Sequence, residues 1–181
     1  MGKWVIDSDH AAARFGVRHF MIANVVGLSS GITGVIHFDP PDISHLSLEA
    51  EIDVASLTTG HPMRDEHLLS SDFFDAGKYP KIIFKSTGAE VTGGRRFSVT
   101  GDLTLRGMTH PVTLEAEYFG PVKSPFSGKI CVGFTATGKI NREDYGMTWN
   151  EAMEGGVVMG KEVQITIELE ADLTTDEWVD G

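Results

Sequence analysis

The chain has 181 residues, a length that one domain can use fully, because a single all-β barrel can take up all of it. Its net charge of −11 disfavours nucleic acid as a partner and disfavours strong docking on anionic lipid, since like charges repel. The single cysteine, Cys131, excludes an intrachain disulfide and lies in a strand pattern. We expect Cys131 to pack as a small apolar residue rather than to act as a nucleophile.

The first residues lead directly into a strand pattern, without the apolar core or cleavage site of a signal peptide. The longest apolar stretch, Met21–Leu28, is too short to span a bilayer. Because one cysteine cannot form an intrachain disulfide, the protein does not require an oxidising compartment. We therefore expect a cytoplasmic protein without stable membrane insertion.

The N-terminal part of the chain predicts four strands. The first covers residues 4–6, and residues 13–19 supply a second set of inward positions at every other residue. A third strand at 36–38 ends at an Asp-Pro-Pro turn. Residues 48–54 alternate apolar with acidic side chains, which places one face in a dry interior and the other in water.

A helix is predicted next, over His61–Ser70. Pro62 fits the first turn of this helix, and Asp65 and Glu66 lie where the helix dipole favours anions. A later break in the strand pattern, Asn141–Met153, predicts a short helix or turn. Such segments can close the ends of a barrel.

The C-terminal part of the chain predicts five further strands, at 82–86, 97–105, 112–118, 130–140 and 163–171. Short turns, several of them with glycine, separate many of these strands and indicate antiparallel pairing. With the earlier segments the count is eight to nine strands. Full closure would remove the sheet edges, so we predict an all-β antiparallel barrel.

The expected inward positions mix phenylalanines with small residues. An eight-stranded barrel can be filled by side chains or can hold one small ligand, and this mixture leaves room for a slender apolar chain. We predict that tryptophan at position 101 or 136 blocks this space and leaves the fold intact. The small residues are Ala13, Ala50, Gly101, Ala116, Ala136, Gly138 and Ala171.

Catalytic motifs are weak in this sequence. Gly27–Gly31 matches the G-x-S-x-G string around Ser29, but a nucleophile elbow needs a helix after the serine, and residues 32–38 predict a strand. We interpret Gly27–Gly31 as a flexible connection. None of the histidines has the spacing of a helical metal site, although a metal site assembled in three dimensions stays open. The histidines are His10, His19, His37, His45, His61, His67 and His110.

Residues near the predicted helix and the later break allow two interpretations each. Arg64 and Asp65 fit an ion pair at the helix start better than a polar gate or head-group contact at the barrel mouth. Met147 and Trp149 fit a pocket wall and an ordinary core equally well.

A set of short motifs runs in order along nearly the whole chain. The most specific stretch is Arg64–Leu68 followed by Ser71–Asp75. The other segments are Trp4–Asp7 with His10, Phe15–His19, Gly27 with Gly31–Gly34, Phe38–Pro40, Tyr79–Pro80, Ile83–Phe84, Gly101–Thr109, Ile140–Gly146 and Gly160–Val163. Together these motifs resemble the YceI-like family of bacterial lipid-binding proteins.

The resemblance implies an extended, eight-stranded lipocalin-like barrel with one or two short helices and a long internal tunnel. We assign it to residues 1–173, followed by an acidic tail at 174–181. It also implies non-enzymatic binding, storage or transport of a polyisoprenoid, an isoprenoid quinone or a fatty-acyl amide, often in a homodimer, with no catalytic residues, metal or cofactor. Ala11 stands where the family usually has serine, which weakens any hydroxyl contact there.

We predict that ten residues line the ligand site: Phe15, Val17, Phe38, Ile52, Phe84, Phe97, Leu103, Leu114, Phe134 and Trp149. Two other functions are kept as alternatives. One is a histidine- or metal-dependent hydrolase or isomerase, and the other is a stress-response interaction protein whose barrel is filled.

Overall fold

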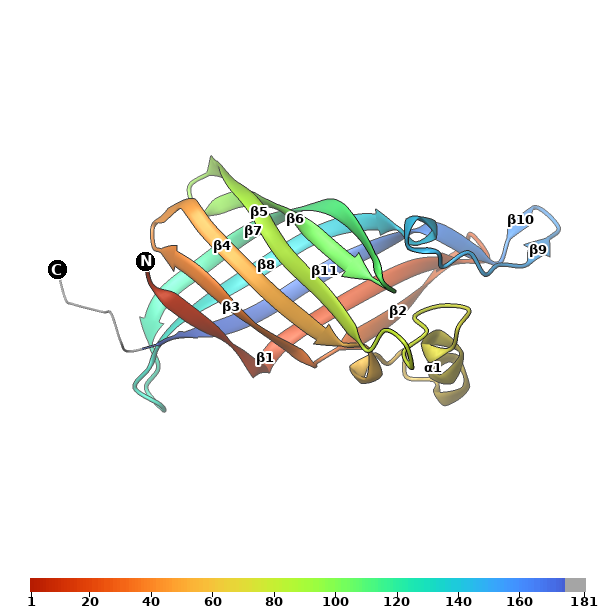
Figure 1. The fold of residues 1–181 in the computed structure, drawn as a ribbon, viewed down its shortest axis with the longest axis horizontal. Coiled ribbons are helices and arrows are strands. Elements are labelled where there is room, and N and C mark those ends of the chain that lie inside the picture. Colours follow the sequence, from red (N-terminus) through yellow and green to blue (C-terminus); the bar gives the residue numbers. More distant parts are fainter. Residues whose placement is uncertain (175–181) are drawn as a thin grey trace.

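A computed structural model of the chain describes residues 1–174, so most of the predicted acidic tail lies outside the described residues. Eight antiparallel strands form a closed ring, because the last strand pairs with the first (Figure 1). This confirms the predicted all-β barrel. The ring consists of β1 (Lys3–His19), β3 (Ile32–Asp39), β4 (Asp42–Asp53), β5 (Lys81–Gly93), β6 (Arg96–Leu105), β7 (Met108–Lys123), β8 (Ile130–Asn141) and β11 (Met159–Leu173).

The first strand, β1, unites two segments that the sequence predicts separately. Relative to β11, the register shifts between Asp7 and Ala11, so the intervening residues bulge out of the ladder. The bulge moves the inward positions from even to odd numbers: Trp4 is buried before it, and Ala13 is buried after it. One continuous strand can therefore serve both ends of a long barrel.

A ninth strand, β2 (Ala23–Ser29), folds back on the far half of β1. The prediction of a flexible connection at Gly27–Gly31 is wrong, because Ser29 ends β2 and Ile32 starts β3. The reason is that β1 runs beyond its pairing with β3 and offers free backbone groups, which β2 satisfies.

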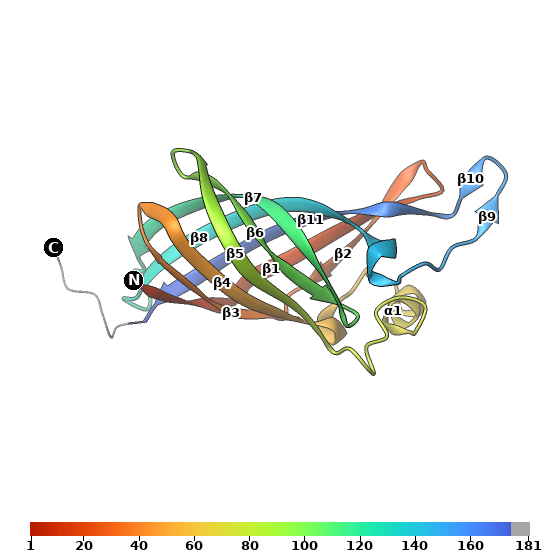
Figure 2. The same cartoon turned by 45° about the horizontal axis from the view of Figure 1, so that its top comes forward.

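Short helices and one hairpin gather at the end of the barrel opposite the N-terminus (Figure 2). The helix α1 (Pro62–Leu69) confirms the predicted helix, with the His61 side chain as its N-cap. Single turns of 3-10 helix, η1 (Val54–Ser56) and η2 (Arg142–Tyr145), lie at strand ends, and the hairpin of β9 (Ala152–Met153) and β10 (Gly156–Val157) follows η2. Among residues 1–174 no helix combines the length and apolar character needed to cross a membrane.

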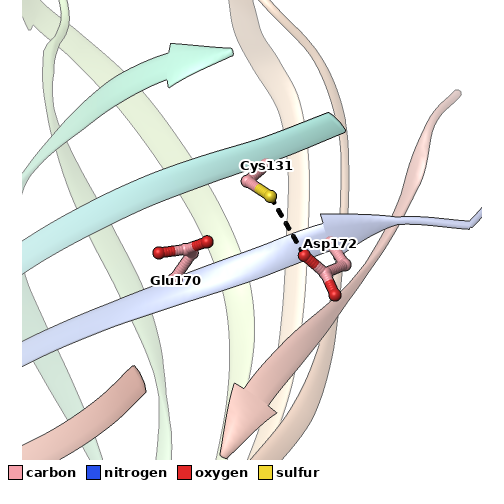
Figure 3. A group of neighbouring side chains, drawn as sticks. All are labelled: Cys131, Glu170 and Asp172. Atoms are coloured by element: carbon pink, nitrogen blue, oxygen red, sulfur yellow. Dashed lines mark hydrogen bonds between the residues drawn. The ribbon is translucent and has the colours of Figure 1, made fainter. Parts of the chain in front are cut away.

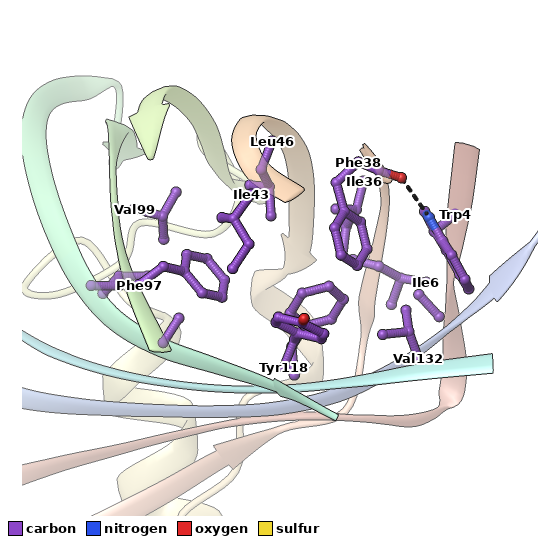
Figure 4. Close-up of a cluster of buried hydrophobic side chains, with 14 of the residues drawn as sticks. Trp4, Ile6, Ile36, Phe38, Ile43, Leu46, Phe97, Val99, Tyr118 and Val132 are labelled. Atoms are coloured by element: carbon purple, nitrogen blue, oxygen red, sulfur yellow. Dashed lines mark hydrogen bonds between the residues drawn. The ribbon is translucent and has the colours of Figure 1, made fainter. Parts of the chain in front are cut away.

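The end of the barrel near the N-terminus is packed solid by aromatic side chains (Figure 4). The Phe38 ring lies 5.6 Å from Trp4, 5.8 Å from Tyr118 and 5.4 Å from Phe134, measured between ring centroids. Trp4 Nε1 donates a hydrogen bond to the Phe38 carbonyl oxygen at 3.1 Å. Tilted and edge-on aromatic pairs add about 0.5–1.5 kcal/mol each to the burial term, so this end is firmly closed.

Candidate functional site

A cavity of about 390 Å³ occupies the interior of the barrel, within the range of about 300–1,000 Å³ that small-molecule sites cover. All eight ring strands contribute to its wall, which is almost wholly apolar. Along β11 the wall extends from Met159 to Leu169, ~33 Å of strand at about 3.3 Å per residue. We call this elongated cavity the tunnel. A barrel filled by its own side chains does not agree with it.

Nine of the ten predicted site residues lie in the tunnel wall: Phe15, Val17, Ile52, Phe84, Phe97, Leu103, Leu114, Phe134 and Trp149. Phe38 does not, and its assignment to the tunnel is corrected here. It is fully buried in the aromatic cluster that closes the barrel near the N-terminus. Strand alternation correctly predicts that Phe38 faces the barrel interior. Its position along the barrel axis places it against the rings of Trp4, Tyr118 and Phe134 rather than at the tunnel. Ligand contact by the other nine stays a prediction.

Side chains outside the strands complete the far end of the tunnel. The His67 ring meets Trp149 and Phe73 edge-on, with centroids 4.9 and 5.0 Å apart. Met147 is buried in the same group, and both Met147 and Trp149 line the tunnel. The two residues therefore belong to the core and to the pocket wall at once. Leu68 and Phe73 were not predicted as lining, because helix and loop residues carry no strand alternation to signal an inward direction.

Two glycines of the barrel are explained by close packing. An added Cβ at Gly27 would lie 2.1 Å from Phe15 Cζ, so the absent side chain leaves space for the Phe15 ring. At Gly101 an added Cβ would lie 2.5 Å from both the Lys85 carbonyl oxygen and Phe84 Cζ. The prediction that tryptophan at 101 blocks the tunnel with the fold intact is therefore wrong, since it would collide with backbone. Ala136 does line the tunnel.

Of the charged side chains that border the tunnel, only Arg142 is buried. Arg14, Arg18 and Arg64 are exposed, His19 and His67 are half-buried, and among the described residues no carboxylate belongs to the wall. The chain as a whole carries a net charge of −11. Arg142 is thus the one buried cation among the described residues of the wall.

Arg64 and Asp65 do not form the ion pair that the sequence favours, at least within the part of the chain that the structure describes. Arg64 donates from Nε to Thr59 Oγ1 and from Nη2 to the Thr59 carbonyl oxygen. Asp65 accepts from Thr59 N and Thr58 Oγ1, each at 2.7 Å. Hydrogen bonds from Thr59 and Thr58 lower the pKa of the Asp65 carboxyl. The two hydrogen bonds to Thr59 hold the exposed Arg64 side chain at the edge of the tunnel.

Among residues 1–174, no group of candidate metal ligands close enough to share an ion lies in the tunnel wall. The Ser29 hydroxyl lies 2.7 Å from the Ser56 hydroxyl, and strands rather than a strand and a helix flank it. Cys131, Glu170 and Asp172 bring three potential ligand atoms within 4.8 Å of one another (Figure 3), but none of them lines the tunnel. The Cys131 thiol donates to Asp172, whose other oxygen pairs with Lys129 at 2.6 Å.

The fold and the tunnel define a lipocalin-like β-barrel with an apolar internal site that one end of the molecule covers. Comparison with known proteins agrees with this class. Residues 4–171 match the model of the YceI-like domain. A UPF0312 protein of Staphylococcus aureus strain N315 is 35% identical over 175 residues, covering 96% of this chain and 99% of that protein. The chain belongs to the YceI-like family.

Solved structures share this architecture. The Campylobacter jejuni YceI protein superposes with a TM-score of 0.74 at 33% identity, over 86% of this chain and 88% of that chain. BcnA of Burkholderia cenocepacia gives a TM-score of 0.80 at 24% identity, over 91% and 98%. A polyisoprenoid binding domain of Saccharophagus degradans gives 0.68 at 15% identity, over 94% and 98%. The last two similarities show the fold.

Proposed function

We propose that this protein binds one long apolar chain non-covalently in the tunnel and stores or carries it, without catalysing a reaction. The observation that supports this most directly is an elongated cavity of about 390 Å³ with an almost wholly apolar wall. Apolar surface drives such binding, and a few polar groups orient the ligand. The candidate ligands are a polyisoprenoid, an isoprenoid quinone and a fatty-acyl amide.

The energetics permit tight binding. A chain of ~15 carbons gains ~12 kcal/mol on burial at about 0.8 kcal/mol per CH₂, before the cost of ordering is removed. Association and ordering costs take a large part of this gain and leave a micromolar or tighter dissociation constant. The fold of a polyisoprenoid binding domain, shared with this chain, supports the same class of ligand. A cytoplasmic location and a homodimer stay predictions of this proposal.

The test is to purify the protein without detergent, weigh it by native mass spectrometry, and identify what organic solvent extracts. We expect a stoichiometric adduct that contains an isoprenoid or acyl chain. The proposal would be overturned if the purified protein carries no adduct and also does not bind added prenyl or acyl lipids. Elemental analysis of the same sample tests the metal-dependent alternative, since a stoichiometric transition metal would favour it.

A matched pair of variants on β8 makes this test specific to the tunnel. Ala136 lines the tunnel, and its neighbour Thr137 is exposed on the other face of the strand. Ala136→Trp should fill the tunnel and abolish the adduct, whereas Thr137→Trp should retain it. If Ala136→Trp folds and binds as much lipid as the wild type, the assignment of the tunnel as the ligand site is wrong.

A further inference from the structure

Arg142, the first residue of η2, is a buried arginine in the tunnel wall whose hydrogen bonding is incomplete. Only 2% of its surface is exposed. Nε donates to the Gly160 carbonyl oxygen at 2.8 Å, and Nη1 donates to the carbonyl oxygens of Met147 and Trp149 at 2.5 and 2.9 Å. Nη2 is buried and has no hydrogen-bond partner among residues 1–174. Three backbone contacts therefore hold the guanidinium in place while one nitrogen stays unused.

No carboxylate of residues 1–174 forms an ion pair with Arg142. The neighbouring carboxylate of Glu143 pairs with Lys161 Nζ at 3.0 Å. Carbonyl oxygens accept hydrogen bonds but carry no net charge, and burial lowers the pKa of Arg142 more than the nearby Glu143 raises it. A buried charge without a counter-ion is costly, and so is a buried donor without an acceptor. Both costs disappear if the acceptor that reaches Nη2 is an anion.

We propose that the Arg142 guanidinium receives the polar end of the bound chain, and that this end is a carboxylate. The proposal rests on the proposed function: it keeps an acyl chain as the ligand and puts a carboxylate in place of the amide at its polar end. One free nitrogen can serve one carboxylate oxygen, but it cannot provide the many donors that a diphosphate requires. A neutral amide or alcohol would satisfy Nη2 but would leave Arg142 without an ion-pair partner.

The experiment compares four ligands with the same 18-carbon chain on wild-type protein: the carboxylic acid, its primary amide, the alcohol and the monophosphate. Affinity is measured by displacement of a fluorescent apolar probe at neutral pH, where the acid is ionised. We expect the acid to bind about tenfold or more tightly than the amide and alcohol, as a hydrogen bond between charged groups implies. Equal affinities, or a phosphate that binds more tightly than the acid, overturn the proposal. If no chain binds, the proposed function fails as well.

Variants assign the preference to Arg142. Arg142→Gln should reduce the ratio of acid to amide affinity to about one while the alcohol still binds, because the apolar wall is unchanged. Arg142→Lys keeps the charge and should retain part of the preference. Arg96→Gln makes the same charge change on an exposed side chain outside the tunnel, and it should keep the full ratio. If Arg142→Gln weakens all four ligands equally, the guanidinium only supports the loop and the proposal is wrong.

Discussion

At the residue scale, the side chain of Phe15 and the missing side chain of Gly27 form one unit of the tunnel wall. The two residues lie directly opposite each other on β1 and β2. We expect Gly27→Ala to destabilise the fold by about 1–3 kcal/mol, because its Cβ overlaps the Phe15 ring. In a double-mutant cycle, Phe15→Leu should recover most of this loss, with a coupling of about 1 kcal/mol or more measured by urea unfolding. Simple additivity of the two substitutions would contradict this packing.

The single thiol should be unreactive in the folded protein. Burial raises the pKa of Cys131 to about 12, and the nearby Asp172 and Glu170 contribute in the same direction. The thiolate, which is the reactive form, is therefore scarce at pH 8. We expect iodoacetamide to modify Cys131 far more slowly in native protein than in guanidinium chloride, measured by intact mass. Asp172→Asn should accelerate the native reaction, since the thiol loses the carboxylate that accepts its proton.

The sequence predicts which face of a strand a residue occupies better than it predicts the position of that residue along the barrel axis. Alternation places Phe84, Phe97 and Leu114 on the inner face, where the structure finds them in the tunnel wall. The same rule places Phe38 inside, but it carries no information on distance along the barrel axis. Alternation also does not predict the burial of Arg142. This burial depends on carbonyl oxygens of the loop after η2 and of the first residues of β11, and the loop has no periodicity.

At the element scale, α1 is the segment that local chemistry predicts most completely, because its cap and its first-turn proline are adjacent in sequence. β1 is the opposite case. Its bulge reverses the inward parity after Asp7, so two short strands are predicted where one long strand exists. β2 is missed because its apolar residues continue on both faces, several of them exposed, such as Val26 and Leu28.

The anchor of α1 should respond to acid. The pKa of Asp65 is lowered in the folded state, so the stabilisation of this helix is complete above about pH 4 and is lost as the pH falls through the lowered value. Asp65→Asn should mimic this loss at neutral pH by weakening the acceptor of the Thr58 and Thr59 hydrogen bonds. The emission of Trp149, which contacts His67 of α1, reports the change.

Two controls accompany this measurement. Trp149→Phe identifies the part of the emission that belongs to Trp149. Glu66→Gln changes an exposed carboxylate on the same helix and should leave both the spectrum and its pH dependence as in the wild type. An Asp65→Asn protein that gives an unchanged Trp149 signal would show that the threonine hydrogen bonds do not hold α1 against the tunnel.

At the scale of the whole molecule, the fold buries one cation in a chain that is acidic on average. The net charge is −11, yet Arg142 is 2% exposed and belongs to the wall of the apolar tunnel. Composition alone predicts only the acidic average. The burial of Arg142 follows from the fold, because the loop after η2 and the start of β11 bring the carbonyl oxygens of Met147, Trp149 and Gly160 around its guanidinium.

A bound ligand should stabilise the folded barrel. The ends of the barrel are packed, but the middle is hollow, and a bound chain would supply the missing contacts. A ligand at 100 times its Kd stabilises the folded state by about 2.7 kcal/mol. For a chain of this size the Tm should rise by roughly 5–11 °C when delipidated protein is reloaded. Scanning calorimetry of stripped, reloaded and Ala136→Trp protein measures this shift. The variant should show none, and an equal shift in the variant would mean that the lipid binds outside the tunnel.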